Sequence, residues 1–280
     1  MIAYVNGQYI AEELATVSIF DRGFLFADAV YEVTAIINGK LVDLENHLAR
    51  LQRSCNELQL TLPISLVQLE HIHDELMKKN ALEEGLIYLQ ITRGNALQRN
   101  FLYPDKDVTP TLVLFAQKAN IVNNAKANSG INVVSVDDIR WGRCDIKTVS
   151  LLAASMAKEY AKQQGADDAI FVKDGYITEG SSSNCFIVNR ANQLQTRGLN
   201  NEILPGITRQ AILSLAKEQN LELIEKAFSL DDMLNAKEAF ITSATALVFP
   251  IVKVNNQPIG KGKPGEIAVR LREIYLQKAN

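Results

Sequence analysis

Apolar and polar residues in the first part of the chain follow both periods that secondary structure imposes. Asn6-Gly7 and Asn38-Gly39 each stand between short apolar runs, and such dipeptides predict tight hairpins. Leucines at helical spacing predict an amphipathic helix that is capped by Asp43 and runs to about residue 60. A capping-box pattern at Ser65 predicts a second helix over 65–80.

Two continuous apolar runs, 86–92 and 111–115, predict buried strands. The residues between them, 94–110, show no periodicity and predict a long irregular loop, and loops of that length are often functional. The polar, Asn-rich stretch 119–130 predicts a linker, and a strand at 131–136 starts a second unit.

The second unit again mixes hairpins with helices. Asp174-Gly175 predicts a hairpin turn, and helices are expected over 150–164, over 207–219, after Ser229 and from about Pro264. Because strands and helices do not alternate strictly, the pattern predicts an α+β fold with two domains. The expected boundaries are a small N-terminal domain over 1–118, the linker over 119–130 and a larger domain over 131–280.

Composition excludes several classes of protein. The chain is 47% hydrophobic and 22% charged with a net charge of −3, which argues against a nucleic-acid binder and against an acidic disordered chain. No apolar run approaches the roughly 18 residues of a membrane helix, and no secretory signal is expected from the first residues. Three scattered cysteines, Cys55, Cys144 and Cys185, favour a reducing cytoplasm without disulfides or a zinc cluster.

Two features are compatible with an anion site. The segment LPGITRQ places Ile207 and Thr208 at a helix start, where free N–H groups and the helix dipole bind phosphate. Arg50 lies on the helix expected over 43–60. Taken singly, an ordinary helix start and a solvated arginine remain the simpler interpretations.

Four further side chains carry chemistry that the local pattern leaves open. Glu179, in TEGSSSN, offers a carboxylate at a strand end or belongs to a polar turn. Lys147 has the apolar neighbours of a Schiff-base lysine, but a surface lysine is the simpler reading. Arg99 binds a carboxylate or is solvated in its loop, and Tyr31 is by default a buried tyrosine. Together, a phosphate site, an amine, a carboxylate and a carboxylate-binding arginine are what a pyridoxal phosphate enzyme needs.

The chain resembles the class IV aminotransferases over nearly its whole length. This group includes D-amino acid aminotransferases, which it resembles most, branched-chain aminotransferases and aminodeoxychorismate lyase. The motifs that carry the resemblance are, in order, DRGFLFADAVYE (21–32), HLARL (47–51), ITRG (91–94), DIRWGRCDIKTVSLLAA (138–154), ITEGSSSN (177–184), ILPGITR (203–209) and ITSAT (241–245).

The resemblance implies fold type IV, with a small N-terminal α/β domain and a larger, barrel-like mixed domain, and pyridoxal 5'-phosphate as the cofactor. Lys147 matches the lysine that holds the cofactor as an aldimine and later moves the α-proton. Glu179 matches the acid that pairs with the ring nitrogen and keeps it protonated.

Five more residues match the family's cofactor site. Arg50 and the backbone of Ile207 and Thr208 match its phosphate-binding groups, and Leu204 matches an apolar residue against the ring. Ala244 stands where a phosphate-binding threonine is expected, so its N–H remains available but a hydroxyl contact is missing.

The family's D-specific members bind the substrate carboxylate with a tyrosine, an arginine and a histidine. Tyr31 matches the tyrosine. Arg99 matches the arginine, which in the family comes from the partner subunit and implies a homodimer with shared active sites. Phe101 stands where the histidine is expected, and its side chain donates no hydrogen bond. Weaker carboxylate binding or a more apolar substrate is therefore expected.

The resemblance implies ping-pong transfer of an amino group between a D-amino acid, such as D-alanine, and a 2-oxo acid, such as 2-oxoglutarate. A branched-chain L-amino acid aminotransferase and aminodeoxychorismate lyase are the alternatives among enzymes. A cofactor-binding protein without turnover is an alternative of another class, against which Lys147 and Glu179 together argue. Apart from small-molecule substrates and a second copy of the chain, no nucleic-acid or membrane partner is expected.

Overall fold

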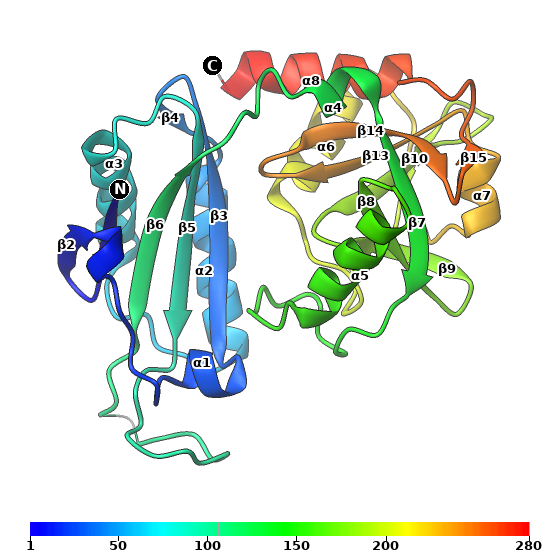
Figure 1. Cartoon of the computed structure of the whole chain (residues 1–280). Helices are drawn as coiled ribbons and strands as arrows, with labels where there is room; N and C mark the ends of the chain where they lie inside the picture. Colours follow the sequence, from blue (N-terminus) through cyan, green and yellow to red (C-terminus); the bar gives the residue numbers. More distant parts are fainter. Residues whose placement is uncertain (106, 280) are drawn as a thin grey trace. The chain divides into compact units, whose positions relative to one another are not determined.

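The computed structural model of the protein describes residues 1–105 and 107–279 (Figure 1). The chain divides into two compact units. Unit 1 comprises Met1–Asn120 together with Ile146–Ser150, and unit 2 comprises Ile121–Asp145 together with Leu151–Asn280. The short segment Ile146–Ser150 therefore belongs to unit 1, although the residues on both sides of it in the sequence belong to unit 2.

Unit 1 is built on a six-stranded antiparallel sheet with the order β2-β1-β6-β5-β3-β4. Its elements in chain order are β1 (Ile2–Val5), β2 (Gln8–Ala11), the 3-10 helix η1 (Glu12–Leu14), α1 (Arg22–Phe26), β3 (Ala29–Ile37), β4 (Lys40–Leu41), α2 (Leu44–Glu57), α3 (Leu66–Lys79), β5 (Gly85–Thr92) and β6 (Leu112–Lys118). Helices α2 and α3 pack on one face of this sheet (Figure 1).

The local signals in unit 1 act largely as expected. Asn6-Gly7 and Asn38-Gly39 connect hairpin strands with positive φ at both residues, which confirms the predicted tight turns. Ser65 and Gln68 form the reciprocal capping box at the start of α3. Asp43 precedes α2, but its backbone is left-handed, with φ of 52°, and its side chain makes no capping hydrogen bond. Asp43 is therefore the N-cap residue of α2, as expected, although it caps the helix without a side-chain hydrogen bond.

The two faces of the unit 1 sheet differ in composition. Side chains that alternate along β5 and β6, such as Ile87, Leu89 and Leu114, form the buried core with α2 and α3. Intervening residues such as Tyr88 and Phe115 point to the opposite face. One face is thus sealed by helices and the other carries aromatic side chains.

Unit 2 is built on a nine-stranded mixed sheet with the order β12-β11-β10-β13-β14-β7-β8-β9, and β15 pairs with β14. Its elements in chain order are α4 (Ala125–Ser129), β7 (Ile131–Asp137), α5 (Leu152–Gln163), β8 (Asp168–Lys173), β9 (Tyr176–Gly180), β10 (Asn184–Val188), β11 (Leu194–Thr196), α6 (Ile207–Glu218), β12 (Leu223–Glu225), α7 (Leu230–Leu234), β13 (Glu238–Ser243), β14 (Leu247–Val254), β15 (Gln257–Pro258) and α8 (Glu266–Ala279).

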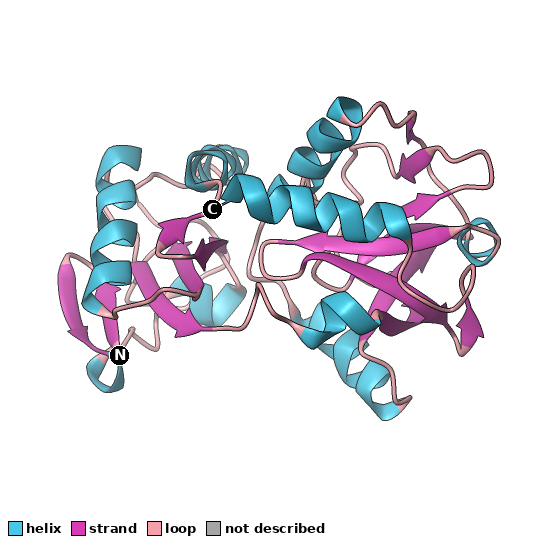
Figure 2. Ribbon diagram, turned by 90° about the horizontal axis from the view of Figure 1, so that it is seen from above, coloured by secondary structure: helices cyan, strands magenta, loops and turns pink. Residues whose placement is uncertain are grey.

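Strand β9, at one end of the sheet of unit 2, also contacts β10 in the interior of that sheet, so the sheet curls. Helix α5 packs on β7 and β8, whereas α6 and α8 pack on β13, and α8 runs along β14 (Figure 2). Buried side chains such as Phe228 and Ile241 fill the core between these layers. The curl brings the ends of several strands close together.

The stretch 119–130 contains ordered structure. Asn124 caps α4, which packs on β14. The buried guanidinium of Arg272, on α8, donates hydrogen bonds to the carbonyl groups of Ile121 and Val122 and to that of Ala246 at 2.6 Å. These backbone carbonyls satisfy the buried guanidinium, and the hydrogen bonds connect the start of unit 2 to its last helix.

The described residues between β5 and β6, 93–105 and 107–111, form an irregular loop, as expected from their sequence. Gly94 begins it with φ of 91°, in the region that favours glycine, and its N–H is bound by the Thr92 hydroxyl at 2.9 Å. A Cβ atom at this position would collide with the carbonyl oxygen of Thr109. Only glycine therefore lets the two ends of the loop approach each other so closely.

Replacement of this glycine is expected to destabilise the protein. Gly94→Ala should lower the free energy of unfolding by about 1–3 kcal/mol, because the new side chain meets both backbone strain and a collision. Gly142→Ala is the matched control, since a Cβ there meets no atom within 4 Å. Urea denaturation compares the two, and equal stabilities would contradict the prediction.

Candidate active site

Lys147 lies beside the edge of β3 in unit 1. The backbone N–H of Tyr31 donates to the carbonyl of Lys147 at 3.0 Å, and Val30 forms a bridge with Thr148. The Lys147 ammonium lies 4.1 Å from the centre of the Tyr31 ring. Among the residues that the structure describes, no carboxylate or hydrogen-bond acceptor pairs with this half-buried ammonium. The amine therefore remains available to react with a carbonyl carbon.

Aromatic rings continue from Tyr31 across the face of the unit 1 sheet that lies opposite α2 and α3. Tyr31 stacks on Tyr88 with ring centres 5.5 Å apart, and Tyr88 stacks on Phe115 at 4.8 Å. The Tyr88 hydroxyl donates to Gln90 at 2.8 Å. Burial raises the pKa of Tyr88, so its hydroxyl stays protonated. Sequence analysis missed Tyr88, although its place in the alternation of β5 is the signal that reveals it.

Arg50 projects from α2 toward β3, where its guanidinium pairs with the carboxylate of Glu32. Its Nε and Nη2 atoms each donate to Glu32 at 2.7 Å, and Nδ1 of His47 lies 2.7 Å from the same carboxylate. All three side chains are buried. Fork-to-fork pairing fixes the plane of the guanidinium, so Arg50 is held in one orientation rather than solvated. Glu32 is a second residue that sequence analysis missed.

The ionised form of Glu32 is favoured strongly. Burial alone would raise its pKa, but the charge and hydrogen bonds of Arg50, assisted by His47, hold the pKa at about 2 instead of its ordinary 4.5. The cluster therefore carries one full negative charge against the Arg50 cation at neutral pH.

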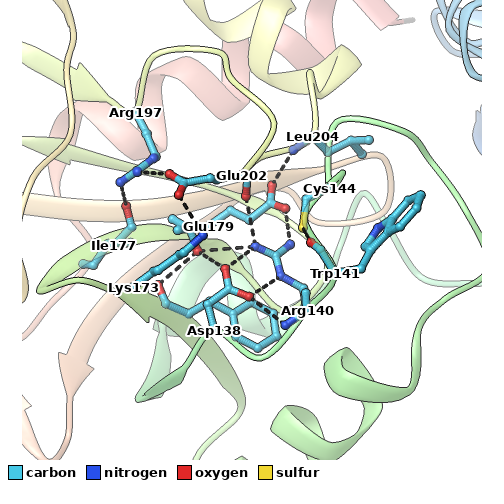
Figure 3. Close-up of polar contacts among 12 residues, drawn as sticks. Asp138, Arg140, Trp141, Cys144, Lys173, Ile177, Glu179, Arg197, Glu202 and Leu204 are labelled. Atoms are coloured by element: carbon cyan, nitrogen blue, oxygen red, sulfur yellow. Dashed lines mark hydrogen bonds and ion pairs between the residues drawn. The ribbon is translucent and has the colours of Figure 1, made fainter. Parts of the chain in front are cut away.

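Glu179 occupies the end of β9 in unit 2, where Arg140 and the backbone of Leu204 approach its carboxylate (Figure 3). Arg140 donates to Oε1, while the Asn184 side chain and the backbone N–H of Leu204 donate to Oε2 at 3.0 and 3.1 Å. Asn184 also donates to the Leu204 carbonyl at 2.9 Å. These bonds favour the carboxylate anion and orient both of its oxygens.

Arg140 is the centre of the polar network in Figure 3. Besides Glu179, its guanidinium binds Asp138 through two nitrogens at 2.9 and 2.7 Å and the Glu202 carbonyl at 3.1 Å. Thr178 donates to Asp138 at 2.7 Å. Burial would lower the pKa of Arg140, but the bonds to Asp138 and Glu179 raise it. A permanent cation is therefore fixed behind Glu179, and neither Arg140 nor Asn184 was recognised from the sequence.

The start of α6 offers backbone donors. Gly206 precedes the helix, and Ile207 and Thr208 occupy its first turn, where helical N–H groups have no intrahelical acceptor. A Cβ at Gly206 would collide with Asn184, the residue that also holds Glu179. The helix start, Leu204 and Glu179 thus form one connected site in unit 2.

Ala244 lies on the turn between β13 and β14. Ser243 caps this turn by accepting from the N–H of Ala246 at 3.1 Å, and Arg272 binds the Ala246 carbonyl. The buried hydroxyl of Thr242 has no hydrogen-bond partner in the described chain. The backbone of the turn is therefore fixed, and the unpartnered hydroxyl belongs to a β13 residue two positions before Ala244.

Arg99 and Phe101 lie on the exposed loop between β5 and β6. The Arg99 guanidinium lies 5.1 Å from the centre of the Phe101 ring, and that ring packs on Phe26. The structure thus groups Lys147 with Tyr31 and Arg99 with Phe101 in unit 1. In unit 2 it groups Glu179 with Leu204, Ile207 and Thr208.

These groups suit pyridoxal 5'-phosphate by their chemistry. Lys147 supplies an amine that no acid neutralises in the described chain, and Glu179 supplies an oriented anion for a ring nitrogen. The first turn of α6 supplies N–H donors for a phosphate. In the described residues, no group of three or more metal-binding side chains gathers, and no helix has the length and apolarity to cross a membrane.

Comparison with known proteins identifies a family and several relatives. The model of the family "Amino-transferase class IV" matches residues 29–254. The chain is 38% identical over 270 residues to a D-alanine aminotransferase of Staphylococcus aureus, covering 96% of this chain and 95% of the relative. It is 39% identical to the D-alanine aminotransferase of Bacillus licheniformis, covering 94% and 91%.

Solved structures share the fold. The branched-chain amino acid aminotransferase of Escherichia coli superposes with a TM-score of 0.91 at 23% identity, covering 99% of this chain and 93% of that one. Another branched-chain amino acid aminotransferase, solved with pyridoxamine 5'-phosphate, gives 0.90 at 24% identity with the same coverage. These neighbours confirm the expected α+β architecture of fold type IV.

The buried Glu32–Arg50 pair is expected to stabilise unit 1 in a pH-dependent way. Glu32→Gln should lower the free energy of unfolding at pH 7 by about 3–5 kcal/mol, because Arg50 loses its buried counter-charge. Since the folded-state pKa lies near 2, this contribution is complete above about pH 4.5 and disappears as the pH falls toward 2.

Urea denaturation from pH 7 to pH 3 measures the effect, and the difference from the unaltered protein should shrink over the acidic part of that range. Glu75→Gln is the control, because Glu75 forms only a partly exposed pair with Lys79 at 3.8 Å and should cost less than about 1 kcal/mol. Similar losses in both variants would refute the assignment.

Proposed function

This chain belongs to the class IV aminotransferases, and we propose that it transfers an amino group from a D-amino acid, such as D-alanine, to a 2-oxo acid, such as 2-oxoglutarate. Membership of the class confirms the family resemblance and the pyridoxal 5'-phosphate cofactor expected from the sequence. The observation that carries the proposal is the 38–39% identity, over nearly the whole chain, to proteins named D-alanine aminotransferase.

We assign the central acid–base role to Lys147. Bound pyridoxal phosphate supplies an electron-withdrawing ring that stabilises negative charge at the substrate's Cα atom. Lys147 would hold the cofactor covalently and, once released, remove the proton from Cα with its Nζ atom. An amine without a counter-ion suits this role, because no ion pair must be broken before it acts.

Glu179 would accept a hydrogen bond from the protonated ring nitrogen. Its charge is maintained by Arg140 and oriented by Asn184 and Leu204, so it is ready for that partner before the cofactor binds. The side chain of Leu204 would lie against the ring.

The phosphate would be held by Arg50 and by the N–H groups of Ile207, Thr208 and Ala244. Glu32 keeps Arg50 ionised and in a fixed plane, which lowers the entropy lost when an anion binds. The alanine at 244 offers a backbone donor without the hydroxyl of the family's threonine.

The substrate carboxylate would be bound by Tyr31 and Arg99, with Phe101 beside it. In this proposal the protein is a homodimer in which Arg99 and Phe101 serve the active site of the partner copy. A cytoplasmic location, predicted from the cysteine content, belongs to the same proposal. All three cysteines are free.

The branched-chain alternative has less support. The solved branched-chain enzymes match this chain in fold at 23–24% identity, whereas the relatives named for D-alanine are 38–39% identical in sequence. Fold alone does not select a substrate within a family. No contact among the described residues favours the lyase alternative.

The visible absorbance of the purified holoenzyme tests the proposal directly. Addition of D-alanine should bleach the band of the lysine-bound cofactor, whereas L-valine should leave it unchanged. Bleaching by L-valine alone would favour the branched-chain alternative. Bleaching by neither would contradict amino transfer from either class of substrate.

Removal of the catalytic amine provides a second test. Lys147→Ala should reduce turnover of D-alanine to background and remove the absorbance of the covalently bound cofactor. Lys126→Ala is the control, because Lys126 forms an exposed pair with Asp167 at 3.0 Å. Near-normal turnover in Lys147→Ala would exclude the proposed mechanism.

A further inference from the structure

Helix α1 forms hydrogen bonds with the loop between β5 and β6. These bonds do not involve the residues assigned to catalysis. The guanidinium of Arg22, a residue only 3% exposed, donates from Nη1 to the carbonyl oxygens of Asn100 at 2.6 Å and Leu102 at 3.1 Å. Its Nε donates to Asp28 at 2.7 Å. Arg22 therefore fixes the backbone on both sides of Phe101.

Arg93 strengthens the same attachment from the end of β5. Its Nε donates at 2.8 Å to the Asp28 oxygen that Arg22 also binds, so two guanidinium groups share one carboxylate. The guanidinium of Arg93 lies 3.7 Å from the centre of the Tyr103 ring. Its terminal nitrogens donate to the carbonyls of Leu58 and Gln59. The loop segment 99–103 therefore contacts two buried arginines, Arg22 and Arg93, which are themselves held by Asp28.

The side chain of Arg99 lies against two rings. Its guanidinium carbon is 5.3 Å from the centre of the Phe26 ring and 5.1 Å from that of Phe101. The two rings are themselves 5.3 Å apart, tilted by 56°. Both distances to the cation lie within the range of cation–π attraction. In the described parts of the chain, no carboxylate competes for Arg99.

We propose that α1 positions Arg99 for the substrate carboxylate, with Phe26 and Phe101 holding its guanidinium and Arg22 holding the backbone. This inference rests on the proposed function, because it takes the assignment of Arg99 to the carboxylate from there. Phe26 and Arg22 are thus positioning residues. An arginine that is already oriented loses less side-chain entropy on binding an anion, which lowers the substrate concentration needed.

The inference also gives Phe101 a physical role. A phenylalanine donates no hydrogen bond to a carboxylate, as the family's histidine does, but its face attracts the neighbouring guanidinium. Phe101 makes no hydrogen bond to the substrate carboxylate, but it offsets this loss by orienting the Arg99 guanidinium toward that carboxylate. Substrates with a single carboxylate and a small side chain depend most on that orientation.

Steady-state kinetics on the holoenzyme tests the role of the Phe26 ring. Phe26→Leu removes the ring but keeps an apolar side chain, and it should raise the KM for D-alanine roughly 2- to 30-fold with little change in kcat. Phe26→Tyr keeps an aromatic face, so its KM for D-alanine should equal that of the unaltered enzyme. Phe24→Leu is the matched control on the same helix, since Phe24 is 71% exposed and should leave KM unchanged.

A double-mutant cycle shows whether Phe26 acts through Arg99. Once Arg99→Gln has removed the guanidinium, Phe26→Leu should cause no further rise in KM. An equal rise in the presence and absence of Arg99 would overturn the proposal, because Phe26 would then act by another route.

Limited trypsin digestion gives a readout that does not depend on activity. Cleavage after Arg99, followed by mass spectrometry of the folded holoenzyme, should be faster in Phe26→Leu and in Arg22→Gln than in Phe24→Leu. Unchanged cleavage in both variants, or an unchanged KM in an active Phe26→Leu enzyme, overturns the proposal. If the unaltered enzyme does not use D-alanine, the proposed function fails while the digestion still decides whether α1 orders Arg99.

Discussion

The pairing of residues 146–150 with β3 is the constraint on which the proposed role of Lys147 as the reactive amine depends. Two backbone hydrogen bonds, from Tyr31 to Lys147 and from Val149 to Ala29, attach this segment to the sheet of unit 1. They fix the position of the Lys147 backbone, and the side chain then lies over the Tyr31 ring. A reactive lysine needs a fixed position, because proton transfer depends on reaching one atom of the substrate. The sheet thus acts as a rigid support for a flexible side chain.

Arginines that pair with carboxylates recur in the polar clusters of both units. Arg50 is held by Glu32, Arg140 by Asp138 and Glu179, and Arg22 by Asp28. In each case the pairing offsets the desolvation of both ions and orients the guanidinium plane. Arg272 differs, because its hydrogen bonds within the described chain go to backbone carbonyls, and its guanidinium carbon lies 5.7 Å from the centre of the Phe249 ring. The first three order groups at or near the proposed chemistry, whereas Arg272 orders the fold.

Much of the fold followed from local signals. Some signals act over only a few residues and can be predicted without tertiary contacts. They are the Asn-Gly turns, the capping box at Ser65 and the helix start after Gly206. The left-handed backbone at Asp43 could not be predicted from the sequence. Aspartate is common at helix N-caps, but it also tolerates the left-handed conformation. The helix α4 was hidden within a polar stretch, where packing on β14 outweighs weak local propensity.

By itself, the sequence determined the family and the cofactor, since ordered motifs such as DIRWGRCDIK and TEGSSSN carry them, and the same motifs contain residues proposed for the chemistry. Only the tertiary structure decided which groups support them. Glu32 faces Arg50 because β3 and α2 pack together, and Arg140 reaches Glu179 from a segment 39 positions earlier in the chain. Phe26 meets Arg99 for the same reason. Periodicity and motif spacing report local geometry, whereas these partners are set by packing between segments that are distant in sequence.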